Sequence, residues 1–428
     1  MRILYIDNYR GFRNTFLELK QVNFLLGDNS TGKTSILSLI NLFSKSTFPI
    51  ERDFNTQDFE LGLFNDIVDL NYKKDFTIGY IRTHFKTSGN RRLSMLLMRF
   101  KQGKKGEIEL KDYRIIIHKE AYQFKICPDK KIRFVRYQLL NKIPKESDLA
   151  AFFQNQVREF YHSRAPRKID NTQFIVAANG FVRYILDKER HIQNATSLLP
   201  RPLYDLSQWI PPIRTSPKRF YELITSSEKT DETPYLLNDL YQAAMKDANK
   251  KQILKEIETF SSQANLFKSI KLKSFDKKGR GPFTIELEIA PETRRNLFYL
   301  GYGVSQSLPV ITNIVLRGST QIYLIQQPEV HLHPKAQAMI GDLLFQKAVN
   351  NKKNFIVETH SDYMVDRFRF AMHNSVNKIF SQVIFFQREN GQNKLYTIEI
   401  QPDGKYSDTQ PKDFREFFIN ESIKLLEL

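Results

Sequence analysis

The amino-acid sequence predicts an α/β fold with three parts: a mixed, largely parallel sheet at the core, an antiparallel β meander and a mainly helical insertion. Near the N-terminus the strongly apolar segment Leu17–Leu26 leads through a glycine-rich turn into Ser35–Phe43, whose apolar residues have helical spacing. Between Phe76 and Tyr137 several short apolar runs follow one another, as in a meander. From Phe283 onward strands and helices alternate, which is typical of a parallel sheet with crossover helices.

These patterns divide the chain into three expected domains. Residues 1–140 begin with the strand Met1–Tyr9 and contain the buried strand, the first helix and the meander. Residues 141–275 have mostly helical spacing interrupted by proline-rich breaks, so we expect a mainly helical insertion there. Residues 276–428 form the C-terminal lobe, in which we expect strands at Phe283–Ile289, Ile322–Ile325 and Asn354–Glu358, and helices from about Ser305 and from Pro334.

Composition favours a protein that folds in the cytoplasm. The chain has 428 residues, of which 41% are hydrophobic, enough to bury a sizeable core. No run approaches the roughly 20 apolar residues that a membrane span needs, and the first residues lack the pattern of a secretory signal. The single Cys127 excludes an internal disulfide framework and a cysteine-rich zinc cluster.

The charge is strongly positive and unevenly distributed. The formal net charge is +18, and residues 71–140 alone hold eighteen Lys or Arg against six Asp or Glu. Such an excess favours a polyanionic partner, and DNA could bind along this basic segment. The alternative is a basic surface that only keeps the protein soluble.

The strongest motif is Gly27-Asp-Asn-Ser-Thr-Gly32-Lys33-Thr34, which fits the phosphate loop G-x-x-x-x-G-K-[ST] and lies between an apolar strand and a helix. Its glycines let backbone N–H groups surround a phosphate, Lys33 reaches the β- and γ-phosphate oxygens, and the hydroxyl of Thr34 binds Mg²⁺. The sequence therefore predicts a site for ATP and Mg²⁺. The expected nucleotide-binding residues of the loop are Gly27, Asn29, Ser30, Thr31, Gly32, Lys33, Thr34 and Ser35.

A second motif, Gln321-Ile-Tyr-Leu-Ile-Gln-Gln-Pro-Glu-Val-His-Leu-His-Pro334, is an apolar strand that ends in polar residues. With it the chain resembles the ABC-type ATPase superfamily within the AAA ATPases, in particular the compact heads related to SMC, RecF and OLD-type proteins. In that family the corresponding strand ends in acid-acid-Pro-Glu-x-His-Leu-His-Pro. The resemblance implies an ABC-type head in which two subunits enclose ATP.

The same resemblance implies roles for residues in other segments. Ser305 lies in Gly-Tyr-Gly-Val-Ser, which is similar to the signature loop that contacts the γ-phosphate of ATP on the opposite subunit. His360, in Glu358-Thr-His-Ser-Asp, is similar to the switch histidine. Gln57 is placed where a glutamine senses the γ-phosphate and the metal. Arg13, after the first strand, is placed near the adenine or the α-phosphate, although ordinary edge packing would explain it equally well.

One departure from the family pattern concerns hydrolysis. Gln326 and Gln327 occupy the positions of the metal-associated acid and the catalytic glutamate. A glutamine amide can ligate weakly or orient a water molecule, but it cannot accept a proton, so hydrolysis should be slow or absent. Two alternatives remain: Glu329 or Glu358 supplies the carboxylate from a neighbouring position, or one glutamine is an engineered replacement of a glutamate.

The resemblance also implies partners. ABC-type heads pair across ATP, so we expect a self-associated dimer and possibly larger assemblies. The chain is most similar to the ATPase subunits of Septu-type antiphage defence, which work with a separately encoded HNH nuclease. The alternative is a DNA-stimulated ATPase of the RecF or SMC repair type. We expect no membrane association.

Overall fold

The chain forms two units, each built around its own sheet. Unit 1 comprises Met1–Lys20, Asp28–Asp205 and Phe386–Leu395, and unit 2 comprises Gln21–Gly27, Leu206–Phe385 and Tyr396–Leu428. The structure is a computed structural model, and it describes residues 1–48, 52–56, 58–85, 90–126, 132–140, 142–162, 200–212, 216–222, 233–246, 251–276, 281–316, 321–408 and 410–414. Contacts thus divide the chain into two interleaved units, and the expected domain boundaries near 140 and 275 stay predictions.

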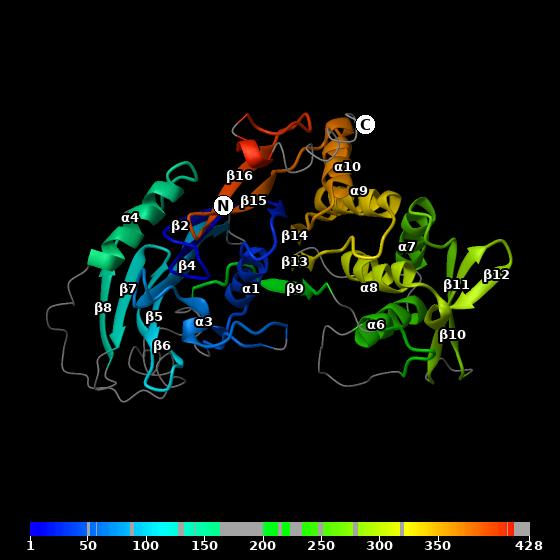
Figure 1. Ribbon diagram of the computed structural model, residues 1–428, viewed down its shortest axis with the longest axis horizontal. Helices are drawn as coiled ribbons and strands as arrows, with labels where there is room; N and C mark the ends of the chain where they lie inside the picture. The colour runs from blue at the N-terminus through cyan, green and yellow to red at the C-terminus, as the bar shows by residue number, and fades with distance from the viewer. Residues whose placement is uncertain are drawn as a thin grey trace. The chain divides into compact units, whose positions relative to one another are not determined.

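Unit 1 contains a seven-stranded antiparallel sheet in the order β2-β1-β4-β5-β6-β7-β8 (Figure 1). The strands are β1 (Arg2–Asp7), β2 (Thr15–Leu19), β4 (Asp75–Phe85), β5 (Arg91–Gln102), β6 (Ile108–Ile117), β7 (Glu120–Ile126) and β8 (Ile132–Gln138). Each neighbouring pair is antiparallel. The predicted meander is therefore confirmed, and it is extended at one edge by β1 and β2.

Helices cover both faces of this sheet. Successive side chains of a strand point to opposite faces, so the sheet has apolar residues to bury on each. Helix α4 (Leu149–His162) packs on the face that carries Ile81 and Leu93, with Phe153 in the same buried cluster. The opposite face meets helix α1 (Lys33–Ser44), whose Phe43 ring lies 5.0 Å from the ring of Tyr80. A short helix, α3 (Phe64–Ile67), lies on the segment that leads to β4. Each fully buried large apolar side chain stabilises this arrangement by roughly 1.5–3 kcal/mol.

Unit 2 contains most of a six-stranded sheet in the order β16-β15-β3-β14-β13-β9. The strands are β3 (Val22–Gly27), β9 (Leu206–Ile210), β13 (Gln321–Gln326), β14 (Asn354–Glu358), β15 (Ser381–Glu389) and β16 (Gln392–Ile400). Strands β3, β14, β13 and β9 are parallel to one another. Their carboxyl ends therefore lie along one edge, where open parallel sheets bind ligands.

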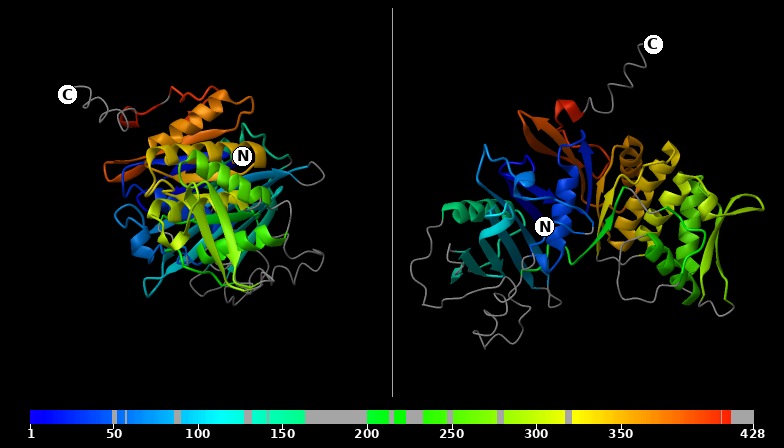
Figure 2. Two further views of the ribbon diagram at one scale, coloured as in Figure 1. Left: turned by 90° about the vertical axis from the view of Figure 1, so that its right-hand side faces the viewer. Right: turned by 60° about the horizontal axis from the view of Figure 1, so that its bottom comes forward.

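The helices of unit 2 supply the rest of its core. They are α6 (Thr233–Lys246), α7 (Lys251–Gln263), α8 (Tyr302–Leu316), α9 (Pro334–Asn351) and α10 (Asp362–Asn374), with a short 3₁₀ turn at Leu297–Tyr299. On α10, Phe368 packs against Phe345 of α9 and Phe24 of β3. A small antiparallel sheet of β10 (Ser269–Ser274), β11 (Phe283–Ala290) and β12 (Thr293–Asn296) lies beside α6 and α7 (Figures 1 and 2). No helix of the described residues is long and apolar enough to cross a membrane.

The structure differs from the sequence prediction in two elements. The expected single strand Leu17–Leu26 is two strands in different sheets, because β2 ends at Leu19 and β3 begins at Val22. The expected helical insertion also contributes two strands: β9, which pairs in parallel with β13, and β10, which pairs antiparallel with β11. Both differences come from tertiary pairing, which local periodicity does not report.

Candidate nucleotide-binding site

The phosphate-loop segment joins the fully buried strand β3 to helix α1, as the sequence predicted. Gly27, Ser30 and Gly32 have positive φ angles of 129°, 61° and 94°. A Cβ atom on Gly32 would lie only 2.6 Å from Cε2 of Phe12, so no other residue fits there without a shift of that ring. The loop therefore has the glycine-dependent curvature that lets backbone N–H groups face a phosphate.

Lys33 closes this loop. Its Nζ donates a hydrogen bond to the carbonyl oxygen of Asp28 at 2.6 Å, and Oγ1 of Thr31 donates to the same oxygen at 2.7 Å. Helix α1 carries no acidic residue in its first turn, and Gly32 offers no side-chain cap to the first N–H groups. A positive helix end with an ammonium group beside it fits a phosphate anion well. Lys33, the loop amides and Thr34 would thus hold the phosphates and the Mg²⁺ ion of ATP.

The ends of β13 and β14 bring the two glutamines to a carboxylate within unit 2. Gln326 lies opposite Glu358 in the parallel register, and its Nε2 donates to Oε2 of Glu358 at 3.1 Å. The backbone N–H of Gln327 donates to the carbonyl oxygen of Glu358 at 2.7 Å, and Gln327 has a φ angle of 40°. The side chain of Glu358 is buried. The structure therefore joins the Gln326 amide to the carboxylate of Glu358 and holds the backbone of Gln327 beside it.

Glu329 and His360 also meet in unit 2. Oε1 of Glu329 accepts a hydrogen bond from the backbone N–H of His360 at 2.7 Å, and the side chain of Glu329 is 9% exposed. His360 is exposed, and it directly precedes Ser361, the N-cap residue of α10. This contact holds the turn that contains His360 against Glu329.

Ser305 lies in the first turn of α8. Its Oγ donates to the carbonyl oxygen of Tyr302 at 3.3 Å, and the residue is 3% exposed. Tyr302 is 67% exposed, and its ring centroid lies 5.5 Å from that of His331. Phe298 and Tyr299 are exposed as well. The expected signature segment is thus a buried serine beneath exposed aromatic residues, which sequence reasoning did not predict.

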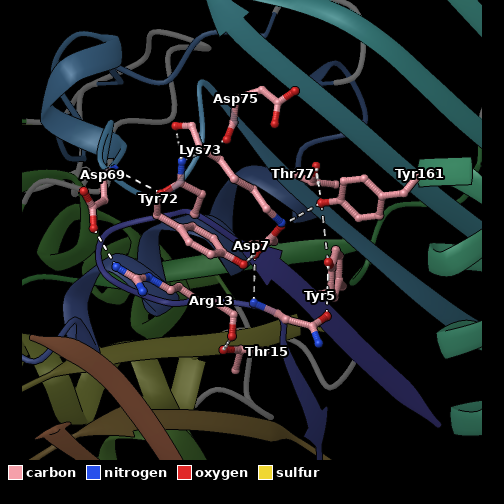
Figure 3. Close-up of polar contacts among 12 residues, drawn as sticks. Tyr5, Asp7, Arg13, Thr15, Asp69, Tyr72, Lys73, Asp75, Thr77 and Tyr161 are labelled. Atoms are coloured by element: carbon pink, nitrogen blue, oxygen red, sulfur yellow. Dashed lines mark hydrogen bonds and ion pairs between the residues drawn. The ribbon is translucent and has the colours of Figure 1, made fainter. Parts of the chain in front are cut away.

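Arg13 has partners of its own in unit 1 (Figure 3). Its Nη2 donates to Oδ2 of Asp69 at 2.8 Å, and its guanidinium lies 4.3 Å from the centroid of the Tyr72 ring. The hydrogen bond from Arg13 lowers the pKa of Asp69. Contact of Arg13 with a nucleotide, which the family resemblance implies, stays a prediction.

The same region contains a buried acid that the sequence did not reveal. Asp7, at the end of β1, accepts from Nζ of Lys73 at 2.5 Å and from Oη of Tyr161 at 2.9 Å (Figure 3). Tyr161 also shares a hydrogen bond of 2.8 Å with Oγ1 of Thr77, and burial raises its pKa. Burial lowers the pKa of Lys73, but the Asp7 carboxylate outweighs it and raises the net value. These residues are far apart in sequence, and they meet through the pairing of β1 with β4 and the packing of α4 on the sheet.

The remaining expected residue, Gln57, lies outside the described residues. The described site residues form two groups. Residues 28–35 belong to unit 1, whereas Gly27, Ser305, Gln326, Gln327, Glu329, Glu358 and His360 belong to unit 2. The boundary between the units falls within the phosphate loop, between Gly27 and Asp28.

Comparison with known proteins places the chain in a family. The sequence model of the AAA ATPase domain matches residues 1–365, so the chain belongs to the AAA ATPase domain family. A search of curated proteins finds no match. The family assignment agrees with the phosphate loop and with the expectation of an ATP-binding protein.

Several solved structures are similar at low identity. An Smc head bound to the C-terminal winged-helix domain of ScpA is 11% identical with a TM-score of 0.44, covering 93% of this chain and 97% of that one. The SMC head domain from Thermotoga maritima is 10% identical with a TM-score of 0.40, covering 93% and 98%. An Smc head from Pyrococcus furiosus, bound to the C-terminal domain of ScpA, is 11% identical with a TM-score of 0.42, covering 100% and 99%. Likeness at this level supports no statement about function.

Proposed function

We propose that this chain is an ABC-type ATP-binding subunit that acts as a nucleotide-gated switch and scaffold for a separately encoded nuclease in antiphage defence, with weak or absent hydrolysis. The phosphate loop supports ATP binding, because Lys33 and the glycine-dependent curvature form a cradle for phosphates. Bound ATP supplies the γ-phosphate, whose presence distinguishes the two states of such a switch.

The proposal rests mainly on which side chains at the ends of β13 and β14 could act as a base and on the hydrogen bonds that they make. Gln326 and Gln327 cannot act as general bases. Of the two carboxylates that could replace them, Glu358 accepts from the Gln326 amide and Glu329 accepts from the His360 N–H, and both are buried. Each of these carboxylates is thus already engaged as an acceptor within the fold, through an oxygen that an attacking water would otherwise use. This arrangement supports tight ATP binding with slow turnover.

Pairing of two copies follows from the ABC-type resemblance. In such a pair the segment around Ser305 of one copy would complete the Lys33 site of the other. The exposed rings of Phe298, Tyr299 and Tyr302 support this role, because aromatic residues are enriched in protein interfaces. The γ-phosphate would then hold the two copies together, and its loss would release them.

The nuclease partner rests on the resemblance to Septu-type ATPases. Coexpression with the product of the adjacent gene tests it directly. We expect an HNH-type nuclease that copurifies with this chain and whose DNA cleavage changes with ATP concentration. A neighbouring gene product that neither binds the chain nor cleaves DNA would contradict this part of the proposal and leave the ATP switch intact.

The hydrolysis part of the proposal predicts the effect of Gln327→Glu. A carboxylate at this position restores a general base, and such a base contributes roughly 10²–10⁴-fold to a rate. We therefore expect phosphate release by Gln327→Glu to exceed that of the wild type by at least about 100-fold. The matched control is Gln346→Glu, which adds the same charge at an exposed position of α9 and should leave the rate unchanged.

If Gln327→Glu leaves the rate unchanged, the base lies elsewhere. Glu329→Gln and Glu358→Gln then identify it, because loss of the working carboxylate would abolish the residual turnover.

The basic segment 71–140 supports a second candidate, a DNA-stimulated ATPase of the repair type. Phosphate release measured with and without duplex DNA separates the two functions. The switch predicts little turnover in either condition, whereas turnover above about one per second that rises with DNA would favour the repair enzyme.

A further inference from the structure

A cluster of arginine residues lies on one face of the unit 1 sheet, away from the residues assigned to ATP. Arg82 of β4 lies opposite Arg2 of β1 on one side and Ser94 of β5 on the other. Two residues further along β4, His84 lies opposite Arg92 of β5. Because side chains two residues apart on a strand share a face, all these groups are on the face opposite to α4.

The segment that leads to β9 crosses the same face and adds a further arginine. The carbonyl oxygen of Arg201 accepts from Oη of Tyr80 at 2.8 Å, and its N–H donates to Oγ of Ser94 at 3.4 Å. The carbonyl oxygen of Leu203 accepts from Nε of Arg2 at 3.0 Å. Backbone groups thus hold this segment on the sheet, and the side chain of Arg201 is left 58% exposed beside the cluster.

Among the residues that the structure describes, positive charge exceeds negative charge in this cluster. Asp205 is the carboxylate that pairs with it, at 3.2 Å from Nη1 of Arg82 and 3.9 Å from Nη1 of Arg201. Burial, followed by the charges of Arg82 and Arg201, lowers the pKa of His84 to about 4, with Arg92 acting in the same direction and Asp205 against it. His84 is therefore neutral at pH 7, because its surroundings repel a further proton.

Two buried polar atoms of the cluster have no partner among the described residues. They are Nε of Arg82, a residue that is only 3% exposed, and Nδ1 of His84. A buried donor without a partner costs roughly 1–3 kcal/mol, and a buried excess of one charge costs more. Other cations of this unit have acids of their own, since Arg99 pairs with Asp112 and Lys111 with Asp75. The arginine cluster thus has fewer acidic partners per cation than these neighbouring residues.

We propose that His84, Arg92 and Arg201 bind a phosphate group, and that Arg82 beneath them supplies positive potential. Guanidinium groups match the geometry of phosphate oxygens and form bidentate hydrogen bonds to them. A bound anion compensates the excess charge and favours protonation of His84, which then donates a further hydrogen bond. The site shares no residue with the proposed nucleotide site, so it does not depend on ATP binding.

The test follows His84 by NMR of the full-length protein labelled with ¹³C-histidine. Loss of one signal in His84→Gln assigns the resonance. In chloride we expect no titration of His84 between pH 5 and 7.5, whereas inorganic phosphate at the same ionic strength should bring its titration into that range. A His84 signal that responds identically to chloride and phosphate would overturn the proposal.

Arginine variants show whether the effect belongs to the cluster. Arg201→Ala and Arg92→Ala should each weaken the phosphate response by at least about tenfold, as expected for loss of one charged hydrogen bond. Arg201→Ala keeps the backbone contacts that hold its segment, so the fold is retained. Lys104→Ala removes one charge from an exposed turn of the same unit and should change nothing. An equal loss in all three variants would show a general charge effect and contradict a built site.

Binding of fluorescent duplex DNA identifies the source of the phosphate. If Arg201→Ala and Arg92→Ala bind DNA more weakly than Lys104→Ala and have a shallower dependence on salt, the ligand is a nucleic-acid backbone. The other outcome is that all three variants bind DNA equally, while Arg201→Ala and Arg92→Ala lose the phosphate response of His84. The ligand is then a small phosphate ester. Either result supports phosphate binding and separates the two sources.

Discussion

At the scale of single residues, Gly32 is the position where the phosphate loop lies against the ring of Phe12, which follows strand β1. Its φ angle of 94° and the nearby Phe12 ring leave no room for a side chain. Gly32→Ala should therefore weaken ATP binding strongly and destabilise unit 1 by about 1–3 kcal/mol. Titration with Mg-ATP and urea unfolding measure the two effects. Gly301→Ala, where no atom lies within 4 Å of the added Cβ, is the matched control for stability and should leave urea unfolding unchanged.

Lys353 is a buried lysine that destabilises the fold at neutral pH. Burial lowers its pKa to about 8 from 10.5, and nearby Lys347 adds to the effect while Glu256 opposes it. The unfolded chain therefore binds more protons between pH 8 and 10.5, so the wild-type protein should gain stability as pH rises through that window. Lys353 donates to the carbonyl oxygen of Ile314, which offsets part of the cost.

Lys353→Met should consequently stabilise the protein by about 1 kcal/mol at pH 7, after allowance for the lost hydrogen bond. The gain should shrink as pH rises from 8 to 10.5 and disappear well above pH 10.5, where the lysine is neutral in both states of the wild type. Urea unfolding at pH 7 and at high pH gives the two values. A variant that is less stable than the wild type at pH 7 would show that the contact with Ile314 outweighs the burial of charge.

At the scale of elements, the sequence predicted those with a local signal and missed those defined by pairing. The meander alternates clearly enough that its five strands follow from the residues alone. Strand β9, Leu206–Ile210, is five residues long and adjoins a proline-rich segment, so its place beside β13 follows only from the tertiary structure. The motif residues Lys33 and Gln326 were found because their spacing is local. Asp7 and Tyr161 meet through the fold alone and had no such signal.

Helix α4 is joined to this buried acid by a hydrogen bond, in addition to its apolar packing on the sheet. Tyr161, in its last turn, donates to Asp7 and bonds with Thr77 of β4. Tyr161→Phe leaves the packing intact but removes these hydrogen bonds and the one accepted from Oη of Tyr5, which should cost about 1–3 kcal/mol. Urea unfolding measures the loss. Tyr363→Phe, at an exposed position of α10, should cost less than about 0.5 kcal/mol, and an equal loss in both variants would contradict the role of Tyr161.

At the scale of the whole molecule, the proposed nucleotide-gated switch requires two copies to pair across ATP. Ser305→Arg places a bulky cation in the first turn of α8, so it should leave ATP bound to a single copy and block pairing. Because Ser305 is buried, Tyr302→Glu provides a second test at an exposed position of the same segment. Its carboxylate would repel the phosphates of the opposing site. Light scattering with and without Mg-ATP should show wild-type pairing and no pairing in either variant.

If Ser305→Arg and Tyr302→Glu pair to the same extent as the wild type, the segment around Ser305 is not part of the interface. The phosphate loop would still bind ATP in that case, because its residues lie elsewhere in the chain. The result would therefore separate nucleotide binding from assembly.

The most direct measurement is sedimentation velocity of the purified 50.4 kDa chain with Mg-ATP, with phosphate release recorded in the same samples. If the chain is such a switch, addition of ATP shifts the wild type from one copy to two or more and leaves Lys33→Ala unchanged. The wild type then releases far less than one phosphate per second. A wild-type chain whose mass does not respond to ATP, or which releases phosphate faster than about one per second, would contradict the proposed switch.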